Sequence, residues 1–291
     1  MTFKRWASRE PHSWAYFVFK GYHHNLNRII WSQKPVVDYI EKHVSITPGD
    51  IQSILGCKNE EKKTIRADKA EWKTDYKDFN NWIRLNALMS LSSCLEIYLS
   101  SIISLSIESD PGILHKASKK IDGAIILKSS DDYQYSDNAQ RCLVGEWSKR
   151  IAEFNNIFNA IPSKLISFQG ELEKIRILRN KVGHAFGRDI DDSRQKGVRQ
   201  ILEIERLSFD RLKKLLGIVN EVVLDVDEFL LKNHIGDYES VYHYHNLRKS
   251  FKPNLTSVQR MMMLKKSVGR EGVMPASKLY CQELIDYYDN L

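Results

Sequence analysis

The stretch WIRLNALMSLSSCLEIYLSSIISLSI, residues 82–107, decides the fold class of this chain. Its apolar side chains recur at spacings of three and four, the period of an amphipathic α-helix: Leu85, Leu88, Leu91, Leu95, Tyr98, Ile102 and Leu105. A second, polar line repeats at the same spacing and consists of Ser93, Glu96, Ser100 and Ser104. The sequence Asp110-Pro111-Gly112 then predicts a sharp end to this helix.

Three further segments have the same helical period. The first is a short helix marked by Trp147, Ile151, Phe154 and Phe158. The second has the apolar positions Leu165, Phe168, Leu172, Ile175 and Leu178, and the third has Leu212, Leu215, Leu216, Val219, Val222, Val226, Phe229 and Leu230. We expect Ser163 and Ser208 to cap the second and third helices, Gly183 and Gly187 to break the second, and His234-Ile235-Gly236 to close the third. Four such helices without an alternating β pattern predict an all-α, up-and-down bundle.

Composition divides the chain into three predicted parts. Residues 75–234 form the helical bundle, with a loop-rich insertion near 110–146 and an exposed connection over 188–200. Residues 1–74 mix aromatic residues with Pro35, Pro48 and Gly49, and predict two or three short helices packed on the bundle. Residues 235–291 form a basic C-terminal extension, which ends in a helix from Ala276 to Tyr288.

The bulk composition favours a globular cytoplasmic protein. The hydrophobic content of 42% is ordinary for a folded domain. Four widely spaced cysteines form no CxxC pair, so neither structural zinc nor a disulfide framework is expected, and the sequence indicates no cofactor. The first residues lack the apolar run of a signal peptide. Leu85–Ile107 is apolar, but Glu96 at its centre and its seven serines favour a buried bundle helix over a membrane span.

The net charge of +7 comes from the two flanks of the chain. Basic and acidic residues number 12 and 7 in residues 1–70, 24 and 24 in 71–234, and 8 and 6 in 235–291. The first 34 residues mix basic side chains with Trp6, Trp14, Tyr16, Phe17, Tyr22 and Trp31. Seven cations without an acidic residue follow in the tail: Arg248, Lys249, Lys252, Arg260, Lys265, Lys266 and Arg270. Both patterns suit RNA binding by phosphate neutralisation and base stacking, and both equally suit solvated surface charge.

The segment IRILRNKVGHAFG, residues 175–187, carries the chemistry. It contains an Arg, an Asn directly after it and a His four residues further on: Arg179, Asn180 and His184. This RNxxxH pattern resembles the signature of the HEPN superfamily, and Cys142–Arg150 resembles the helix before that signature in one branch of these proteins. The resemblance covers roughly residues 75–234. Arg5 and His12 have a similar spacing but lie in no helical pattern, so we attribute that pair to chance.

The two residue types suit RNA cleavage independently of any family. Histidine titrates near neutral pH and serves as a general base or acid, and arginine stabilises the growing charge of a phosphate. Residues five apart on a regular helix point about 140° away from each other, so Arg179 and His184 would not converge there. Gly183 permits the unwound backbone that would bring them together. The structural alternatives are a helix-end arginine covering carbonyls and a surface histidine.

Two further residues are candidates for the same site. Asn180 would orient the phosphate or the histidine, or would instead be a C-terminal cap. Glu96 would hold Arg179 or assist at the site, or would instead face solvent. The run Tyr242-His243-Tyr244-His245 is a poor metal site because it offers two histidines and no third ligand, so we interpret it as an RNA-contacting or packing segment.

The resemblance implies a metal-independent endoribonuclease in which the RNA's own 2′-OH attacks phosphorus and leaves a 2′,3′-cyclic phosphate. It implies a homodimer, since the reaction needs both a base and an acid, and a toxin–antitoxin or anti-phage defence setting with an antitoxin or regulator as partner. The alternatives are a HEPN fold that binds RNA or a partner protein without cutting, and a helical interaction protein in which the motif arises by chance.

Overall fold

The computed structural model describes residues 2–129, 135–185, 187–189, 202–271 and 275–291. Every regular element in these ranges is a helix, which confirms the predicted all-α class. The chain folds as two compact units, each assembled from separate stretches of sequence. The terminal unit consists of Met1–Lys20, Leu95–Gly170 and Glu221–Leu291, and the central unit consists of Gly21–Cys94 and Glu171–Asn220.

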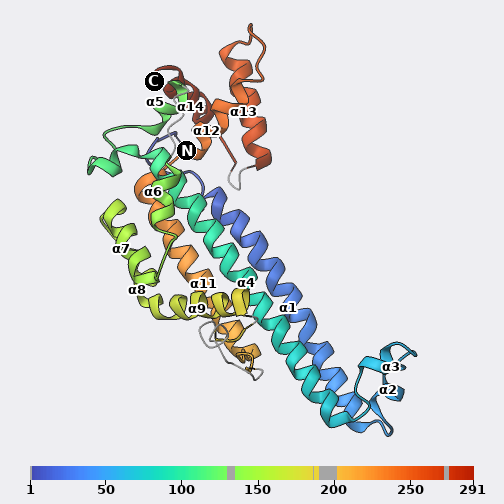
Figure 1. The fold of residues 1–291 in the computed structure, drawn as a ribbon. Helices are drawn as coiled ribbons and strands as arrows, with labels where there is room; N and C mark the ends of the chain where they lie inside the picture. The colour runs from blue at the N-terminus through green and yellow to red at the C-terminus, as the bar shows by residue number, and fades with distance from the viewer. Residues whose placement is uncertain (1, 130–134, 186, 190–201, 272–274) are drawn as a thin grey trace. The chain divides into compact units, whose positions relative to one another are not determined.

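Two long helices form the frame of the central unit, α1 (Trp14–Ile46) and α4 (Lys69–Ser109). Within this unit they lie side by side, and the short helices α2 (Ile51–Ile54) and α3 (Glu61–Thr64) lie in the connection between them (Figure 1). Gln33 Nε2 donates a hydrogen bond of 2.8 Å to Asn80 Oδ1 across this pair.

The second stretch of the central unit contributes most of α9 (Gln169–Ala185) and the first half of α11 (Phe209–Leu230). These helices complete its core with buried side chains from all four long helices: Ile30, Val44, Leu85, Leu88, Leu91, Leu172, Ile175, Leu212 and Leu216.

The prediction of two or three short helices in the N-terminal region is wrong for residues 14–46, which form one helix of 33 residues with Pro35 inside it. An interior proline costs a helix about 3 kcal/mol. Full burial of an isoleucine or valine side chain contributes about 1.5–3 kcal/mol. The buried Ile30 and Val44, on either side of the proline, therefore offset its cost.

The terminal unit contains both ends of the chain and the last third of α4, from Leu95 on. Its other elements are η1 (Pro111–His115), α5 (Gly123–Ser129), α6 (Ser136–Arg141), α7 (Trp147–Phe158), α8 (Ser163–Ser167), the π-helical turn η2 (Leu231–Ile235), α12 (Tyr238–Arg248), α13 (Ser257–Glu271) and α14 (Lys278–Asp289). Its core holds several aromatic side chains: Phe19, Tyr98, Phe154, Phe158, Tyr244, Tyr280 and Tyr288.

Arg5 fastens the N-terminal segment inside the terminal unit. Its guanidinium donates hydrogen bonds to the Ile235 carbonyl at 2.8 Å, to the Ser109 carbonyl at 2.9 Å and to Asp122 Oδ1 at 2.9 Å. The Arg5 carbonyl in turn accepts the backbone amide of Asp237 at 2.9 Å. Arg5 is therefore a structural residue, in keeping with our attribution of its spacing to His12 to chance.

Most of the predicted helix ends agree with the structure. The central helix ends at Ser109, directly before Asp110, and Ser208 Oγ accepts the amide of Arg211 at 3.1 Å as a cap of α11. The prediction that Ser163 caps its helix is wrong. The residue before α8 is Pro162, and Asp225 from α11 instead accepts the amide of Lys164 at 2.7 Å.

The predicted domain boundaries fall within continuous elements. The boundary at 74/75 lies inside α4, and the boundary at 234/235 lies inside η2. The insertion near 110–146 contains the short helices η1, α5 and α6. Its centre at 130–132, and most of the connection over 188–200, lie outside the described residues.

Helix α4 is long and apolar enough to cross a membrane, judged by length and composition alone. Part of its most apolar window, 44%, is buried inside the protein. A core helix of a globular protein has the same properties, so this is weak evidence for a membrane span.

Candidate functional site

The segment Arg179-Asn180-Lys181-Val182-Gly183-His184 lies in the last turns of α9, in the central unit. Leu172 and Ile175 bury the apolar face of this helix. Arg179 and Asn180 are half-buried, and His184 is exposed one residue before the helix ends at Ala185. The His184 imidazole is therefore accessible to a substrate from solvent.

The prediction that Gly183 unwinds the helix is wrong. Helix α9 runs through Gly183 and His184 to Ala185, and the nearest positive φ among the residues that the structure describes, +81°, lies at Gly187. Regular helical geometry therefore holds between Arg179 and His184, and their side chains leave the helix about 140° apart. The backbone of a single α9 does not direct the guanidinium and the imidazole to one point.

Asn180, the middle residue of the motif, holds the Arg179 side chain. Arg179 Nη1 donates a hydrogen bond of 3.1 Å to Asn180 Oδ1. Asn180 and His184 are four residues apart and share a helix face. The contact orients Arg179, a role that the sequence did not suggest for Asn180, while its predicted roles toward the phosphate or the histidine stay predictions.

The end of α9 is held in place by contacts that the sequence did not reveal. Lys181 Nζ lies 2.6 Å from Glu205 Oε1 and 3.6 Å from Asp189 Oδ2, and the hydrogen bond to Glu205 raises the pKa of this lysine. The Gly187 amide donates to the Lys181 carbonyl at 2.9 Å. A Cβ at Gly187 would lie 2.8 Å from Ile204 Cγ2, so the turn after His184 requires glycine for both space and backbone conformation.

Helix α4 fixes the segment that returns beside α9. The buried Asn81 donates a hydrogen bond from Nδ2 to the Glu205 carbonyl at 2.8 Å, and its Oδ1 accepts one from the Leu207 amide at 2.9 Å. Arg84 Nε donates 2.5 Å to the Leu207 carbonyl. Asn81 and Arg84 thereby position Glu205, and through it the last turn of α9. Asparagine and arginine on an apolar helix were the available signal, since buried polar groups require partners.

Glu96 lies in the terminal unit, where it faces Arg150 with 3.8 Å between Oε1 and Nη1. Arg150 is buried, donates 2.9 Å to the Gly145 carbonyl and lies 5.1 Å from the Trp147 ring. Glu96 thus has a structural role beside Arg150, a partner that the sequence did not predict.

The predicted RNA-binding tail is exposed over most of its length. Arg248, Lys249, Lys252, Lys265 and Lys266 all face solvent. Arg260 differs, because its guanidinium lies 2.8 Å from Asp289 Oδ2 and its charge is opposed. The side chain of Arg270 lies outside the described part of the structure.

The aromatic residues of the N-terminal flank divide by location. Tyr16 is buried, and Trp6, Trp14 and Phe17 are half-buried, so these four contribute to packing. Tyr22 and Trp31 are exposed at 55% and 51%. Only these two of the six are open enough for the stacking role considered from the sequence.

The terminal unit contains a buried polar cluster that was not predicted from the sequence. Asp227 accepts hydrogen bonds from the hydroxyl of Ser13 and from its amide at 3.2 Å, and it lies 3.3 Å from His12 Nδ1. Burial raises the pKa of Asp227. Glu239 Oε1 accepts the Trp14 amide at 2.9 Å, and burial raises the pKa of Glu239 to about 8.

A small cavity adjoins this cluster. Its lining residues are Ser8, Arg9, Glu10, Trp14, Gly236, Asp237, Glu239, Ser240, His243 and Val268. Its volume of about 20 Å³ suffices for about one water molecule. Pockets for small organic ligands measure about 300–1,000 Å³, so this cavity is too small for such a ligand.

The run Tyr242-His243-Tyr244-His245 lies in α12, where Tyr244 and His245 are buried and Tyr242 is exposed. His245 Nδ1 lies 2.7 Å from the hydroxyl of Tyr288, and His243 Nε2 lies 2.9 Å from Ser267 Oγ. In the part of the chain that the structure describes, no group of three or more His, Cys, Asp or Glu side chains is placed to hold a metal ion.

Comparisons with protein-family models, with curated proteins and with solved structures found no match to this chain.

Proposed function

We propose that this chain is a HEPN-like endoribonuclease that cuts RNA without a metal ion and acts as a homodimer. The observation that carries the proposal is the placement of the motif: His184 is exposed at the end of α9, and Arg179 is hydrogen-bonded to Asn180 on the preceding turn. The all-helical fold, with the long α11 after the motif, is compatible with the resemblance.

The chemistry follows from these side chains. A His184 imidazole takes the proton of the RNA 2′-OH, the 2′-oxygen forms a bond to phosphorus, and the bond from phosphorus to the 5′-oxygen breaks. A second acid donates a proton to the departing 5′-oxygen. Arg179 stabilises the charge that grows on the phosphate oxygens, and Asn180 holds the guanidinium. The products are a 2′,3′-cyclic phosphate and a 5′-hydroxyl.

The geometry of α9 is the reason for proposing two copies. One chain supplies one histidine in this motif, and its helix directs Arg179 away from His184. A twofold pair of α9 helices supplies a second imidazole as the acid and places the arginine of one copy near the histidine of the other.

The proposed setting is a cytoplasmic toxin–antitoxin or anti-phage defence system, with an antitoxin or regulator as a further partner. The resemblance of the motif supports this setting. RNA is the proposed substrate, and no cofactor is included in the proposal.

Cleavage of labelled RNA in excess EDTA tests the proposal directly. We expect cutting to persist and the new 3′ ends to be cyclic phosphates. His184→Ala should reduce the rate by about 10²–10⁴-fold, the usual contribution of a general acid or base. Activity lost in EDTA and restored by magnesium or manganese would reject the mechanism.

Two matched variants control this experiment. His115 is an exposed histidine in the terminal unit, and His115→Ala should leave cleavage unchanged. Arg176 lies one turn before Arg179 on α9 and pairs with Glu173 at 2.6 Å, so Arg176→Ala should cost far less than Arg179→Ala. A loss under tenfold for His184→Ala would reject the assignment, and RNA binding without cutting would select the non-catalytic alternative.

A further inference from the structure

Helix α1 carries a seam of exposed side chains with a seven-residue repeat. Within the central unit, Tyr22, Ile29, Val36 and His43 are seven apart, and a second set of Asn25, Ser32, Tyr39 and Ile46 lies three residues after each of them. All eight side chains are exposed. Alternating spacings of three and four over several turns form the contact stripe of a two-stranded coiled coil.

The seam is distinct from the face that α1 buries. The buried side chains of α1 in this unit, Ile30 and Val44, each follow a seam residue by one position. They point about 100° away from it around the helix. The seam therefore stays exposed to solvent, whereas the buried face of α1 already packs within the chain.

Five of the eight side chains are large and apolar. Their exposed fractions are 55% for Tyr22, 66% for Ile29, 52% for Val36, 67% for Tyr39 and 71% for Ile46. Isolated exposed apolar residues need no explanation, but a continuous line of them marks an interaction surface. We propose that this seam binds the same seam of a second copy of the chain, with the two α1 helices antiparallel.

The order of side chains along the seam supports a second copy as the occupant. In an antiparallel pair centred near Lys34, Tyr22 meets Ile46 and Ile29 meets Tyr39 of the other copy. Of the three polar positions, Asn25 and His43 also meet each other, and the small Ser32 meets Val36. The large apolar side chains thus face apolar side chains, and Asn25 and His43 can hydrogen-bond across the interface.

The same order favours antiparallel over parallel pairing. In a parallel pair Tyr22 would face Tyr22 and Ser32 would face Ser32. Layers of two large side chains would then alternate with layers of two small ones along the same pair of helices. Antiparallel pairing matches each tyrosine with an isoleucine and Ser32 with Val36. Such layers fit a nearly constant distance between helix axes of about 8–10 Å.

The area of the seam is sufficient for a weak, specific dimer. With about 200 Å² for a tyrosine and about 100 Å² for an aliphatic side chain, the exposed parts of the five apolar residues amount to roughly 430 Å² per copy. Two copies would bury roughly 900 Å² before Asn25, Ser32 and His43 are added. A biological interface requires about 1,000 Å² in total, which this seam reaches with its polar layers.

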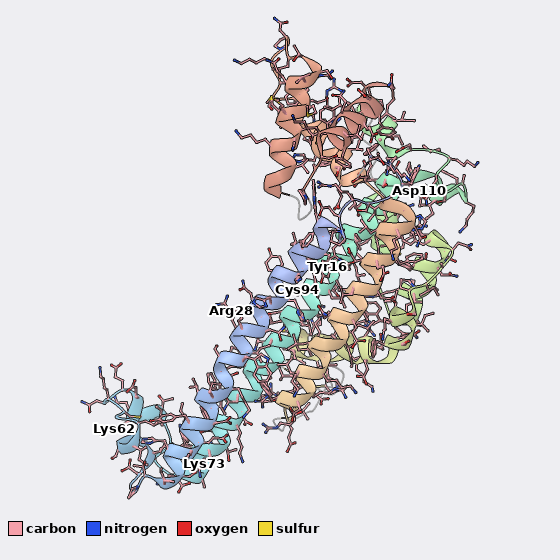
Figure 2. The ribbon with its side chains drawn as sticks, turned by 180° about the vertical axis from the view of Figure 1, so that it is seen from behind. Tyr16, Arg28, Lys62, Lys73, Cys94 and Asp110 are labelled. Carbon is pink, nitrogen blue, oxygen red and sulfur yellow. The ribbon has the colours of Figure 1, made fainter. Side chains whose placement is uncertain are left out.

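The charges beside the seam predict how the dimer responds to salt. Arg28 is exposed on α1 (Figure 2), and Lys42 is exposed two helical repeats later. Antiparallel pairing brings Arg28 of one copy near Lys42 of the other, and like charges repel. Salt screens this repulsion, so the dimer should tighten as ionic strength rises. RNA binding has the opposite dependence, because counterion release makes it weaker with salt.

The experiment measures the mass of the full-length protein by light scattering over a range of concentrations. We expect a monomer–dimer equilibrium, and Ile29→Glu should weaken it about a hundredfold or more, because the symmetric interface would bury two unpaired charges. Leu55→Glu, at an exposed apolar residue outside α1 in the same unit, is the control and should dimerise as the parent does. Circular dichroism establishes that both variants fold.

Cysteine crosslinking tests the register. A mixture of Asn25→Cys and His43→Cys chains should crosslink to each other, and Asn25→Cys alone should not. Crosslinking of Asn25→Cys alone would overturn the antiparallel pairing. A monomer at every concentration, or a dimer indifferent to Ile29→Glu, would overturn the interface. A monomer that binds lipid vesicles through the same seam would also overturn the interface. A dimer indifferent to Ile29→Glu would reject this seam and leave the α9 pairing of the proposed function possible, so that outcome separates the two proposals, whereas a monomer at every concentration would contradict both.

Discussion

Glu239 of α12 accepts the backbone amide of Trp14, the first residue of α1, at 2.9 Å. A carboxylate at a helix N-terminus normally gains stability from the unsatisfied amides there. Here burial dominates, and the neighbouring Asp227, Asp237 and Glu10 add to its effect, so the pKa of Glu239 rises to about 8. The side chain is therefore protonated at neutral pH and binds the start of α1 as a neutral group.

This relationship predicts that stability falls as pH rises. The unfolded carboxyl has a pKa of about 4.3, so the contribution of Glu239 is fully present below that value and is lost as pH rises to about 8. The melting temperature should thus be higher at pH 6 than at pH 8. Glu239→Gln cannot ionise and should reduce this difference.

Exposed Glu228 provides the control for this measurement. Its pKa is lowered by the hydrogen bond from Lys232, so Glu228→Gln should leave the decrease between pH 6 and pH 8 intact. An unchanged pH dependence in Glu239→Gln would show that Glu239 is ionised in the folded protein, contrary to the prediction.

Arg5 should be among the most sensitive positions for stability. Arg5→Ala removes a buried cation that binds Ile235, Ser109 and Asp122, and it leaves the half-buried Asp122 carboxylate without its ion-pair partner. Breaking a buried charged network costs about 3–5 kcal/mol of unfolding free energy. Urea unfolding measures this loss, with the exposed neighbour Lys4→Ala as control. A loss below about 0.5 kcal/mol, typical of surface sites, would contradict the assignment.

The helices with simple apolar periods could be predicted from sequence, and the N-terminal helix could not. Residues 82–107 repeat at spacings of three and four, and the structure places them inside α4. In α1 the exposed seam and the buried stripe lie on different faces of the helix and both carry apolar side chains, so apolar residues occur at too many positions to reveal one face. Pro35 added a second misleading signal, because tertiary packing outweighs its local cost.

The candidate site shows a similar limit. The motif at Arg179 and His184 was visible in the sequence, but the backbone between them was not. Gly183 tolerates an unwound conformation without requiring it, and the helix continues because Lys181 and Glu205 hold its last turn. Glu205 lies 24 residues away in sequence, and no local pattern predicts such a contact.

Co-expression of wild-type and His184→Ala chains tests whether each cut needs two histidines. Equal random mixing gives about one quarter wild-type homodimers, so total activity should fall to about one quarter if both histidines are required. Independent sites would retain about one half. A retained fraction near one half, at full dimerisation, would contradict the two-histidine mechanism while leaving His184 as a catalytic residue.

The exposed tail cations should set the salt dependence of RNA binding. Residues 71–234 contain equal numbers of basic and acidic residues, so attraction for a polyanion must come from the flanks or from the site itself. Each phosphate contact on a single strand releases about 0.7 counterion. Replacing both Lys265 and Lys266 with glutamine should therefore lower the slope of log affinity against log salt by about 1.4.

Arg260 provides the control that distinguishes an exposed charge from one that is already paired. It lies in the same helix, α13, but its guanidinium is engaged with Asp289 at 2.8 Å and with the Tyr244 hydroxyl at 3.3 Å. Arg260→Gln removes one positive charge, as each of the two lysine replacements does, yet it should change the slope by much less than one of them. Cleavage at saturating RNA should persist in both variants, because His184 lies on another helix in the other unit. If the double lysine variant bound RNA with an unchanged slope, the tail would not contact phosphates, and its charge would be free to serve a protein partner.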